Sequence, residues 1–207
     1  MKSTSEKDFM DRKPEKNSKP RVLIDLDGVV RDFVGSLQRV YQREYPDHQL
    51  LPVNSRRLEE FFPIKEKIYD FLENRFIEEV MEEADPYPGA LEALNRWQSE
   101  FHLVIVTAQP AGIRHCTFRW IGRHCLPVDE VHISYYKSEI PGPALLDDFT
   151  DNLQEFRKTG RLAVCLDRPW NQQWNGERVQ TVDAFFRLLQ KKMYGNEKTE
   201  QTNQYLT

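Results

Sequence analysis

The chain has 207 residues, of which 39% are hydrophobic and 30% are charged, and its formal net charge is −4. This length allows one domain of ordinary size, or a core with a modest insertion. The acidic balance excludes a general electrostatic attraction to nucleic acid or to anionic lipid, so neither a stable nucleic-acid partner nor a membrane is expected. No apolar stretch approaches the roughly 20 residues that span a bilayer.

The first part of the chain predicts a tail, a strand and a helical insertion. Residues 1–20 are rich in Lys, Glu, Ser and Asp and contain no apolar segment, which predicts a disordered N-terminal tail rather than a signal peptide. Residues 21–25 predict a buried strand, and residues 33–45 show the 3.6-residue apolar spacing of an amphipathic helix. Residues 46–84 are rich in Arg, Glu and aromatic residues and contain no strand candidate, which predicts short helices.

Short apolar strands alternate with helices along the rest of the chain. The predicted strands are 101–107, 131–133, 143–146 and 162–166, and the predicted helices are 90–100, 110–125, 152–158 and 182–192. Such alternation is typical of an α/β fold with a parallel sheet and right-handed crossovers. Residues 193–207 are expected to form a polar C-terminal tail.

The cysteines bear on the cellular compartment and on metal binding. Cys116, Cys125 and Cys165 are an odd number in a chain without an export signal, which favours a reducing, cytoplasmic setting. The pairs His115-Cys116 and His124-Cys125 raise the alternative of a zinc site. Two helical turns separate the pairs, which is too far for one compact tetrahedral site, so structural or surface roles are favoured.

Two aspartates end the first predicted strand. Asp25 and Asp27 are separated by one residue and are followed by Gly28, and side chains two apart on a strand point the same way. They would lie at the carboxyl end of a parallel strand, where open α/β sheets bind ligands. Two like charges so close need a cation, a shared proton or solvent. A divalent metal ion satisfies this need, with one carboxylate as nucleophile and the other as proton donor; a solvated acidic turn is the alternative.

Three later segments add polar residues at strand ends or in the loops beside them. Thr107 ends the second predicted strand, Lys137 lies in the loop after the third, and Asp147-Asp148 follow the fourth. A threonine hydroxyl beside a helix N-terminus binds phosphate oxygens, and a lysine neutralises charge on a phosphate. The order and placement of all these segments together favour phosphoryl transfer over a set of unrelated caps and surface residues.

Each residue then has a chemical role. Asp25 would attack phosphorus to give an aspartyl-phosphate, and Asp27 would protonate the leaving oxygen and deprotonate the attacking water. A hard cation with oxygen ligands would be held by Asp25, the backbone carbonyl of Asp27 and Asp148. Thr107 and Lys137 would bind the transferred phosphate.

These segments resemble the motifs of the haloacid dehalogenase (HAD) superfamily of phosphatases. Asp25-Leu26-Asp27-Gly28-Val29 is similar to the first motif, Thr107 to the second, Lys137 to the third and Asp147-Asp148-x-x-x-Asn152 to the fourth. The resemblance implies a HAD-like, Rossmannoid three-layer core with a parallel sheet, a Mg²⁺ cofactor and a small helical cap inserted after the first strand. The core would comprise residues 21–33 and 85–192, and the cap residues 34–84.

Within the superfamily, the chain resembles the 5'(3')-deoxyribonucleotidase group. The segment from Asp25 to Phe33 is similar to that group's first motif, and Arg56-Arg57 with Phe61-Phe62 resembles its cap. The resemblance implies a 5'-nucleotidase-like phosphoric monoester hydrolase that acts on nucleoside monophosphates. It also implies a set of substrate-binding residues, namely Phe33, Phe61, Phe62, Thr107, Ala108 and Lys137.

The second motif departs from that group. Thr107-Ala108-Gln109-Pro110 stands where the group usually has Thr-Ser-Pro, so one hydroxyl is lost and one residue is added. Two alternatives stay open: a phosphatase for another small phosphate ester or a nucleic-acid 3' phosphate, and a catalytically silent binding protein. The sequence also leaves open whether the chain forms a homodimer.

Overall fold

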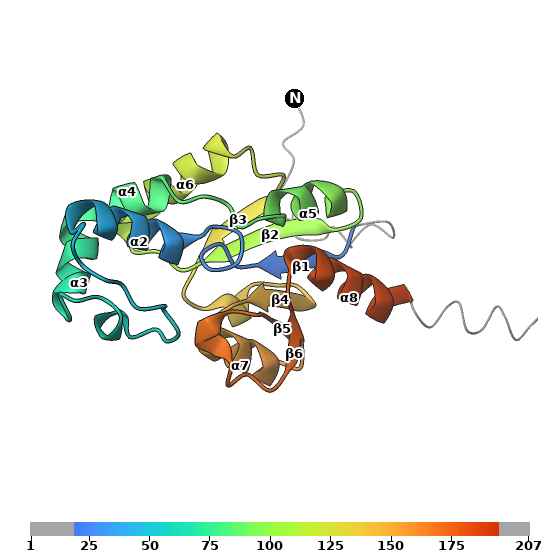
Figure 1. Cartoon of the computed structure of the whole chain (residues 1–207). Coiled ribbons are helices and arrows are strands. Elements are labelled where there is room, and N and C mark those ends of the chain that lie inside the picture. Colours follow the sequence, from blue (N-terminus) through green and yellow to red (C-terminus); the bar gives the residue numbers. More distant parts are fainter. Residues whose placement is uncertain (1–18, 195–207) are drawn as a thin grey trace, which may run out of the picture.

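A computed structural model describes residues 19–194, so the predicted tails at 1–20 and 193–207 lie almost entirely outside the described residues. Within residues 19–194, six strands form one parallel sheet in the order β3-β2-β1-β4-β5-β6 (Figure 1). The chain extends from β1 to β2 and β3 on one side and later returns to β4 on the other. Ligands of such sheets bind where the strand order reverses, which here is beside β1. The strands are β1 Arg21–Ile24, β2 His102–Thr107, β3 Glu130–Ile133, β4 Ala144–Asp147, β5 Leu162–Leu166 and β6 Glu177–Val179.

Helices cover both faces of this sheet and give three layers (Figure 1). Side chains of α5, α6 and α8 share a hydrophobic cluster with one face, and α7 packs against the other. None of the helices described between residues 19 and 194 is long and apolar enough to cross a membrane. The helices are α2 Phe33–Glu44, α3 Lys67–Asp70, α4 Ile77–Glu82, α5 Ala90–Trp97, α6 Arg114–Arg123, α7 Thr150–Lys158 and α8 Val182–Tyr194.

The alternation of side chains along the strands explains both covered faces. Ile24 and Ile105 belong to the cluster with α5 and α8, whereas their neighbours Leu23 and Val104 belong to the cluster with α7. All four side chains are fully buried. Because helices cover both faces of a parallel sheet, its strands are apolar on both sides, as the continuous apolar runs in the sequence indicate.

The helical insertion, which is the segment between β1 and α5, has a hydrophobic cluster of its own. In it the Tyr41 ring of α2 packs against Phe62, with ring centroids 4.9 Å apart, and against Phe71, 5.4 Å away. A 3-10 turn at Leu58–Glu60 and a π-helical turn at Phe71–Phe76 accompany the short helices α3 and α4. Residues 46–84 contain no strand in the structure, as the sequence predicts. Figure 1 shows this helical segment at the end of the sheet toward which β1 points.

Five of the six strands in the described residues are the ones that the sequence predicts, and the differences have local causes. The strand β6 has no apolar run, since two of its three residues are Glu177 and Arg178, and it was not predicted. The predicted helix 110–125 is divided into a 3-10 turn at Ala111–Ile113 and α6, where Pro110 and Gly112 disfavour a continuous α-helix. The predicted helix 152–158 begins two residues earlier, at Thr150.

The separate cluster around Tyr41 gives a first prediction. Phe62 is 1% exposed, and we expect Phe62→Ala to lower the free energy of unfolding by about 3–5 kcal/mol, the usual range for a truncated core phenylalanine. Phe118→Ala is the matched control, because Phe118 is 54% exposed and should change stability by about 0.5 kcal/mol or less. Urea unfolding of both variants measures the difference; similar losses in the two would contradict the assignment of Phe62 to a packed core.

Candidate active site

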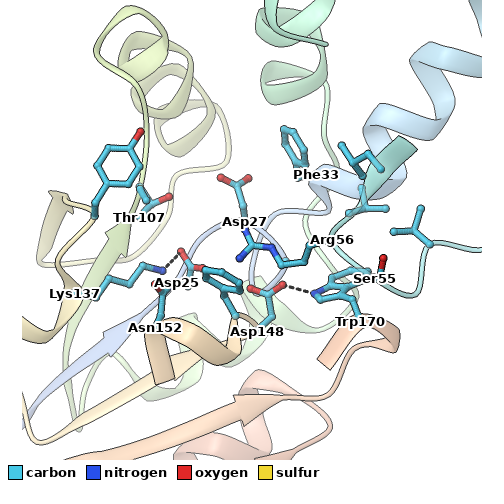
Figure 2. A pocket seen from close by; sticks show the side chains of 17 residues that line it. Asp25, Asp27, Phe33, Ser55, Arg56, Thr107, Lys137, Asp148, Asn152 and Trp170 are labelled. Carbon is cyan, nitrogen blue, oxygen red and sulfur yellow. Dashed lines mark hydrogen bonds and ion pairs between the residues drawn. The ribbon is translucent and has the colours of Figure 1, made fainter. Parts of the chain in front are cut away.

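A cavity of about 390 Å³ opens at the carboxyl ends of β1, β2 and β4, beneath the helical insertion (Figure 2). This size lies within the range of small-molecule sites. A second cavity, of about 610 Å³, shares Asp27, Phe33, Arg56 and Ala108 with it and extends toward α4. The core residues that line the first cavity include Asp25, Asp27, Gly28, Thr107, Ala108, Lys137, Asp148 and Asn152.

Asp25 lies where β1 meets β4. Its backbone N–H donates to the Leu146 carbonyl over 2.9 Å, and its Oδ1 accepts from the Leu26 N–H over 2.7 Å. The same Oδ1 is 2.8 Å from the Lys137 ammonium. Burial raises the pKa of Asp25 well above its usual value, and the charge of Lys137 opposes this shift. The two contacts to Oδ1 therefore fix the orientation of the Asp25 carboxylate, and they leave its other oxygen free to bind or react.

Asp147 positions Lys137. Its Oδ2 accepts from the Lys137 ammonium over 2.7 Å and from the Asn152 amide over 3.0 Å, and its Oδ1 accepts from the Phe149 N–H over 2.8 Å. Both side chains are buried, Asp147 completely. Burial opposes the charge on Lys137, but the charges of Asp147 and Asp25 outweigh it and raise the pKa of the lysine. Lys137 is thus a fixed positive charge beside Asp25.

Asp148 turns toward the cavity beside Asp147. Its Oδ2 accepts from the Trp170 indole N–H over 2.7 Å (Figure 2). Burial, followed by the charge of Asp147, raises the pKa of Asp148 to about 6. Carboxylate oxygens of Asp25, Asp147 and Asp148 all lie within 4.8 Å of one another. Since one lysine contacts this set of buried carboxylates, the site has an excess of negative charge and hard oxygen donors, which suits a divalent cation.

The Asp27 carboxylate is held away from Asp25, as Figure 2 shows. The fully buried Arg31 binds both its oxygens, with Nε 2.7 Å from Oδ1 and Nη2 2.9 Å from Oδ2. The Gln109 amide donates to Oδ2 over 2.7 Å and lies 3.4 Å from the Thr107 hydroxyl. The side chains of Arg31 and Gln109 therefore fix the orientation of Asp27. Gln109 belongs to the second motif, whose sequence is altered in this chain.

Arg56 brings a positive charge from the insertion to the cavity. Its guanidinium carbon lies 3.1 Å from the centroid of the Phe149 ring, and both residues line the cavity. Burial lowers the pKa of Arg56, and the charges of Asp148 and Asp147 oppose this shift. An arginine in such a site binds phosphate oxygens through its planar donor fork.

Of the three phenylalanines that the sequence predicts at the substrate, only one lines the cavity. Phe33 lines it, but Phe61 and Phe62 do not, because both are buried among the apolar side chains of the insertion. The burial of Phe61 and Phe62 disfavours a contact with substrate, and their role in substrate binding stays a prediction. Aromatic rings that the sequence did not single out, those of Tyr135 and Phe149, line the cavity in their place.

The remaining predicted residues come together, and several partners were not foreseen. Asp25, Asp27, Thr107, Ala108, Lys137 and Asp148 all line the one cavity. Sequence reasoning did not identify roles for Arg31, Gln109 and Trp170. For Gln109 a signal was present, because it is the residue added to the second motif; nothing local indicates that Arg31 returns to Asp27 or that Trp170 reaches Asp148. The roles of all these residues in catalysis stay predictions.

Comparisons with known proteins agree with this geometry. A family model described as 5' nucleotidase, deoxy (pyrimidine), cytosolic type C protein matches residues 19–192. The human cytosolic-type 5'(3')-deoxyribonucleotidase is 27% identical over 140 residues, which cover 62% of this chain and 70% of the human protein. The mouse mitochondrial 5'(3')-deoxyribonucleotidase is 26% identical over 146 residues, which cover 63% of this chain and 65% of the mouse protein.

Solved structures show the same fold at low identity. A HAD-hydrolase from Bacillus subtilis bound to magnesium gives a TM-score of 0.56 at 12% identity, covering 84% of this chain and 99% of that one. A haloacid dehalogenase-like hydrolase from Streptococcus pneumoniae gives 0.56 at 13% identity, covering 82% and 98%. The predicted HAD-like α/β fold is confirmed.

The contact between Gly28 and Asp148 gives a second prediction. Gly28 and Gly89 have φ of +79° and +78°, and a Cβ at Gly28 would lie 2.2 Å from Asp148 Oδ2, whereas a Cβ at Gly89 would meet nothing within 4 Å. Replacing either by alanine should cost about 1–2 kcal/mol of stability, because the backbone is left-handed. Only Gly28→Ala should displace Asp148 and weaken Mg²⁺ binding.

The measurement is the rise in melting temperature when Mg²⁺ is added, since a ligand of the folded state stabilises it. We expect this rise in the unaltered chain and in Gly89→Ala, and a clearly smaller one in Gly28→Ala. An equal rise in both variants would show that Asp148 does not bind the cation.

Proposed function

Because the chain belongs to the 5' nucleotidase, deoxy (pyrimidine), cytosolic type C family and is a phosphoric monoester hydrolase, we propose that it hydrolyses nucleoside monophosphates, deoxyribonucleotides foremost. The reaction would proceed through an aspartyl-phosphate on Asp25 and require Mg²⁺. The observation that carries the proposal is the buried Lys137, which joins Asp25 to Asp147 beside a cavity that Arg56 of the insertion also lines.

In the first step, Asp25 attacks phosphorus while the bond between phosphorus and the ester oxygen breaks. The carboxylate is oriented for this by the Leu26 N–H and by Lys137, so little rotation remains to be lost on reaction. Asp27 gives a proton to the leaving alkoxide, and the nucleoside departs. Lys137 and Arg56 stabilise the charge that spreads over the phosphoryl oxygens.

In the second step, Asp27 takes a proton from water, which attacks the aspartyl-phosphate and releases inorganic phosphate and the Asp25 carboxylate. For either transfer the Asp27 carboxyl must reach the substrate. Arg31 and Gln109 fix where this carboxyl lies relative to Asp25. Arg31 and Gln109 are then positioning residues that set the rest position of the proton donor.

The residues present fit Mg²⁺. Asp25 and Asp148 offer buried oxygen ligands, and Gly28 gives Asp148 room that a Cβ would fill. The backbone carbonyl of Asp27 would complete the protein ligands. When bound, the cation neutralises the excess carboxylate charge and acts as a Lewis acid toward the phosphate. Asp147 is less suited as a ligand, because its oxygens already accept from Lys137, Asn152 and the Phe149 N–H.

The nucleoside would occupy the part of the cavity farthest from the strand ends. Phe33 and Tyr135 line the cavity and offer flat rings for a base, and stacking of a base on an aromatic ring is worth roughly 1–3 kcal/mol. Residues 34–84 would act as a cap that covers the bound nucleotide and shields the aspartyl-phosphate from stray water. A cytoplasmic setting fits the three free cysteines, and a homodimer remains a prediction.

A substrate panel tests the proposal. It contains deoxynucleoside 5'- and 3'-monophosphates, ribonucleotides, sugar phosphates, a 3'-phosphorylated oligonucleotide and an aryl phosphate, each with Mg²⁺ and with a chelator. We expect the highest kcat/KM for deoxynucleoside monophosphates, no turnover in chelator, and none with Asp25→Asn. A preference for sugar phosphates or for the oligonucleotide would show that the proposed substrate class is wrong. Absence of turnover with every ester would favour a catalytically silent binding protein.

The Gln109 amide gives a prediction specific to this chain. Gln109→Leu keeps the side-chain size but removes the donor to Asp27. We expect kcat to fall about tenfold with KM unchanged, a part of the ~100-fold or more that a general acid supplies. The loss should be largest for esters with poor leaving groups. Gln98→Leu, at an exposed position, is the control, and a rise in KM alone would place Gln109 at the substrate instead.

A further inference from the structure

A second cluster of metal-binding residue types lies outside the catalytic cavity, between the last helix of the insertion and the core. Glu78 and Glu82 are one turn apart on α4, and His115 and Cys116 lie in the first turn of α6. Figure 1 shows α4 beside α6. One ligand atom from each of the four side chains lies within 4.8 Å of all the others.

The distances suit a tetrahedral ion. His115 Nε2 is 3.5 Å from Glu78 Oε1 and 3.4 Å from Cys116 Sγ. Zinc bonds of about 2.0–2.1 Å to nitrogen and 2.3 Å to sulfur place neighbouring tetrahedral ligands about 3.3–3.8 Å apart. Two edges of the tetrahedron are therefore already formed around His115. The other separations between the four ligand atoms are at most 4.8 Å.

Burial and charge also favour a cation here. Cys116 is fully buried, whereas the side chains of Glu78 and His115 are 63% and 42% exposed, so an ion can approach from solvent and rest on the thiol. The carboxylates of Glu82 and Glu78 lie beside the Cys116 thiol and add negative charge there. Binding of a divalent cation would offset these charges and release the thiol proton to solvent.

Glu82 is the weakest of the four candidates. Arg119 lies 2.7 Å from its Oε1, and Arg123 lies 3.7 Å from its Oε2. These arginines partly neutralise Glu82 and would compete with an ion for it. His115, Cys116 and Glu78 would therefore supply most of the binding, with Glu82 or water as the fourth ligand.

We propose that Glu78, Glu82, His115 and Cys116 bind Zn²⁺ and thereby tie α4 of the insertion to α6 of the core. A thiolate, an imidazole and carboxylates form a donor set that zinc prefers and that the hard Mg²⁺ avoids. The site is thus chemically distinct from the all-carboxylate cluster at Asp25. The pair His124-Cys125 does not belong to it, so the partners of His115-Cys116 come from the insertion rather than from the second pair.

A second group that contains histidines provides a control. His102 and His132 both bind Glu130, at 2.7 and 2.8 Å, but Arg21 also contacts Glu130 and the group contains no sulfur. A positive side chain thus already occupies the position that an ion would need. His132→Asn should leave zinc binding unchanged, as should Cys125→Ser at an exposed cysteine.

The experiment is a Co²⁺ titration of the full chain with excess Mg²⁺ present to fill the carboxylate site. We expect one equivalent of cobalt to produce the near-ultraviolet band of a cobalt–thiolate bond and the visible bands of tetrahedral cobalt, and Zn²⁺ to remove them. Cys116→Ser should abolish the thiolate band. His115→Asn and Glu78→Gln should each weaken binding about 10–100-fold, the range known for disturbed metal sites.

Several results would overturn the zinc proposal. If Cys116→Ser does not fold, the exposed positions His115 and Glu78 still decide, because both substitutions must weaken binding. The proposal is wrong if cobalt gives no thiolate band in the full chain, if Cys125→Ser removes the band, or if His115→Asn and Glu78→Gln bind as the full chain does. None of these readings depends on phosphatase activity.

Discussion

The ion pair that joins Lys137 to Asp25 and Asp147 is the interaction on which the rest of the site depends. The ammonium lies 2.8 Å from one carboxylate and 2.7 Å from the other, and all three side chains are almost fully buried. Removing one partner of such a pair usually costs about 3–5 kcal/mol, because a charge is left buried without compensation. Lys137 therefore makes the buried Asp25 carboxylate tolerable and fixes its direction, as the proposed role of Asp25 as nucleophile requires.

The sheet topology explains why these groups meet. β1 lies between β2 and β4, and parallel pairing places Asp25, Thr107 and Asp148 at the same edge although more than 120 positions separate the first from the last. Each of these residues follows or ends a buried strand. An apolar run that is followed by a polar residue therefore locates each of them in the sequence. That is why the positions of Asp25, Lys137 and the pair Asp147-Asp148 could be located from the sequence: they follow from strand ends, which are local signals.

Other parts of the site depend on contacts that no local pattern encodes. Phe61 and Phe62 have the composition of a stacking pair, but whether a phenylalanine of a small helical insertion faces the substrate or its own core is decided by packing, and here Tyr41 covers Phe62. Arg31 follows the first motif closely, yet its fork on Asp27 requires the chain to turn back at Gly28. The strand β6 has too few apolar residues to be distinguished from a loop.

The insertion meets the core through two contacts of different chemistry. In its first half, Arg56 stacks on Phe149, and both residues line the cavity. At its end, α4 packs against α6, where Glu78 contacts His115 and Glu82 contacts Arg119 and Arg123. A substrate phosphate would compete for Arg56, whereas Glu78 and Glu82 line neither of the two cavities. Binding of substrate would therefore change the contact between Arg56 and Phe149 and leave the contact between α4 and α6 in place. We expect the segment around Arg56 to respond to the nucleotide, while α4 keeps the insertion attached to the core.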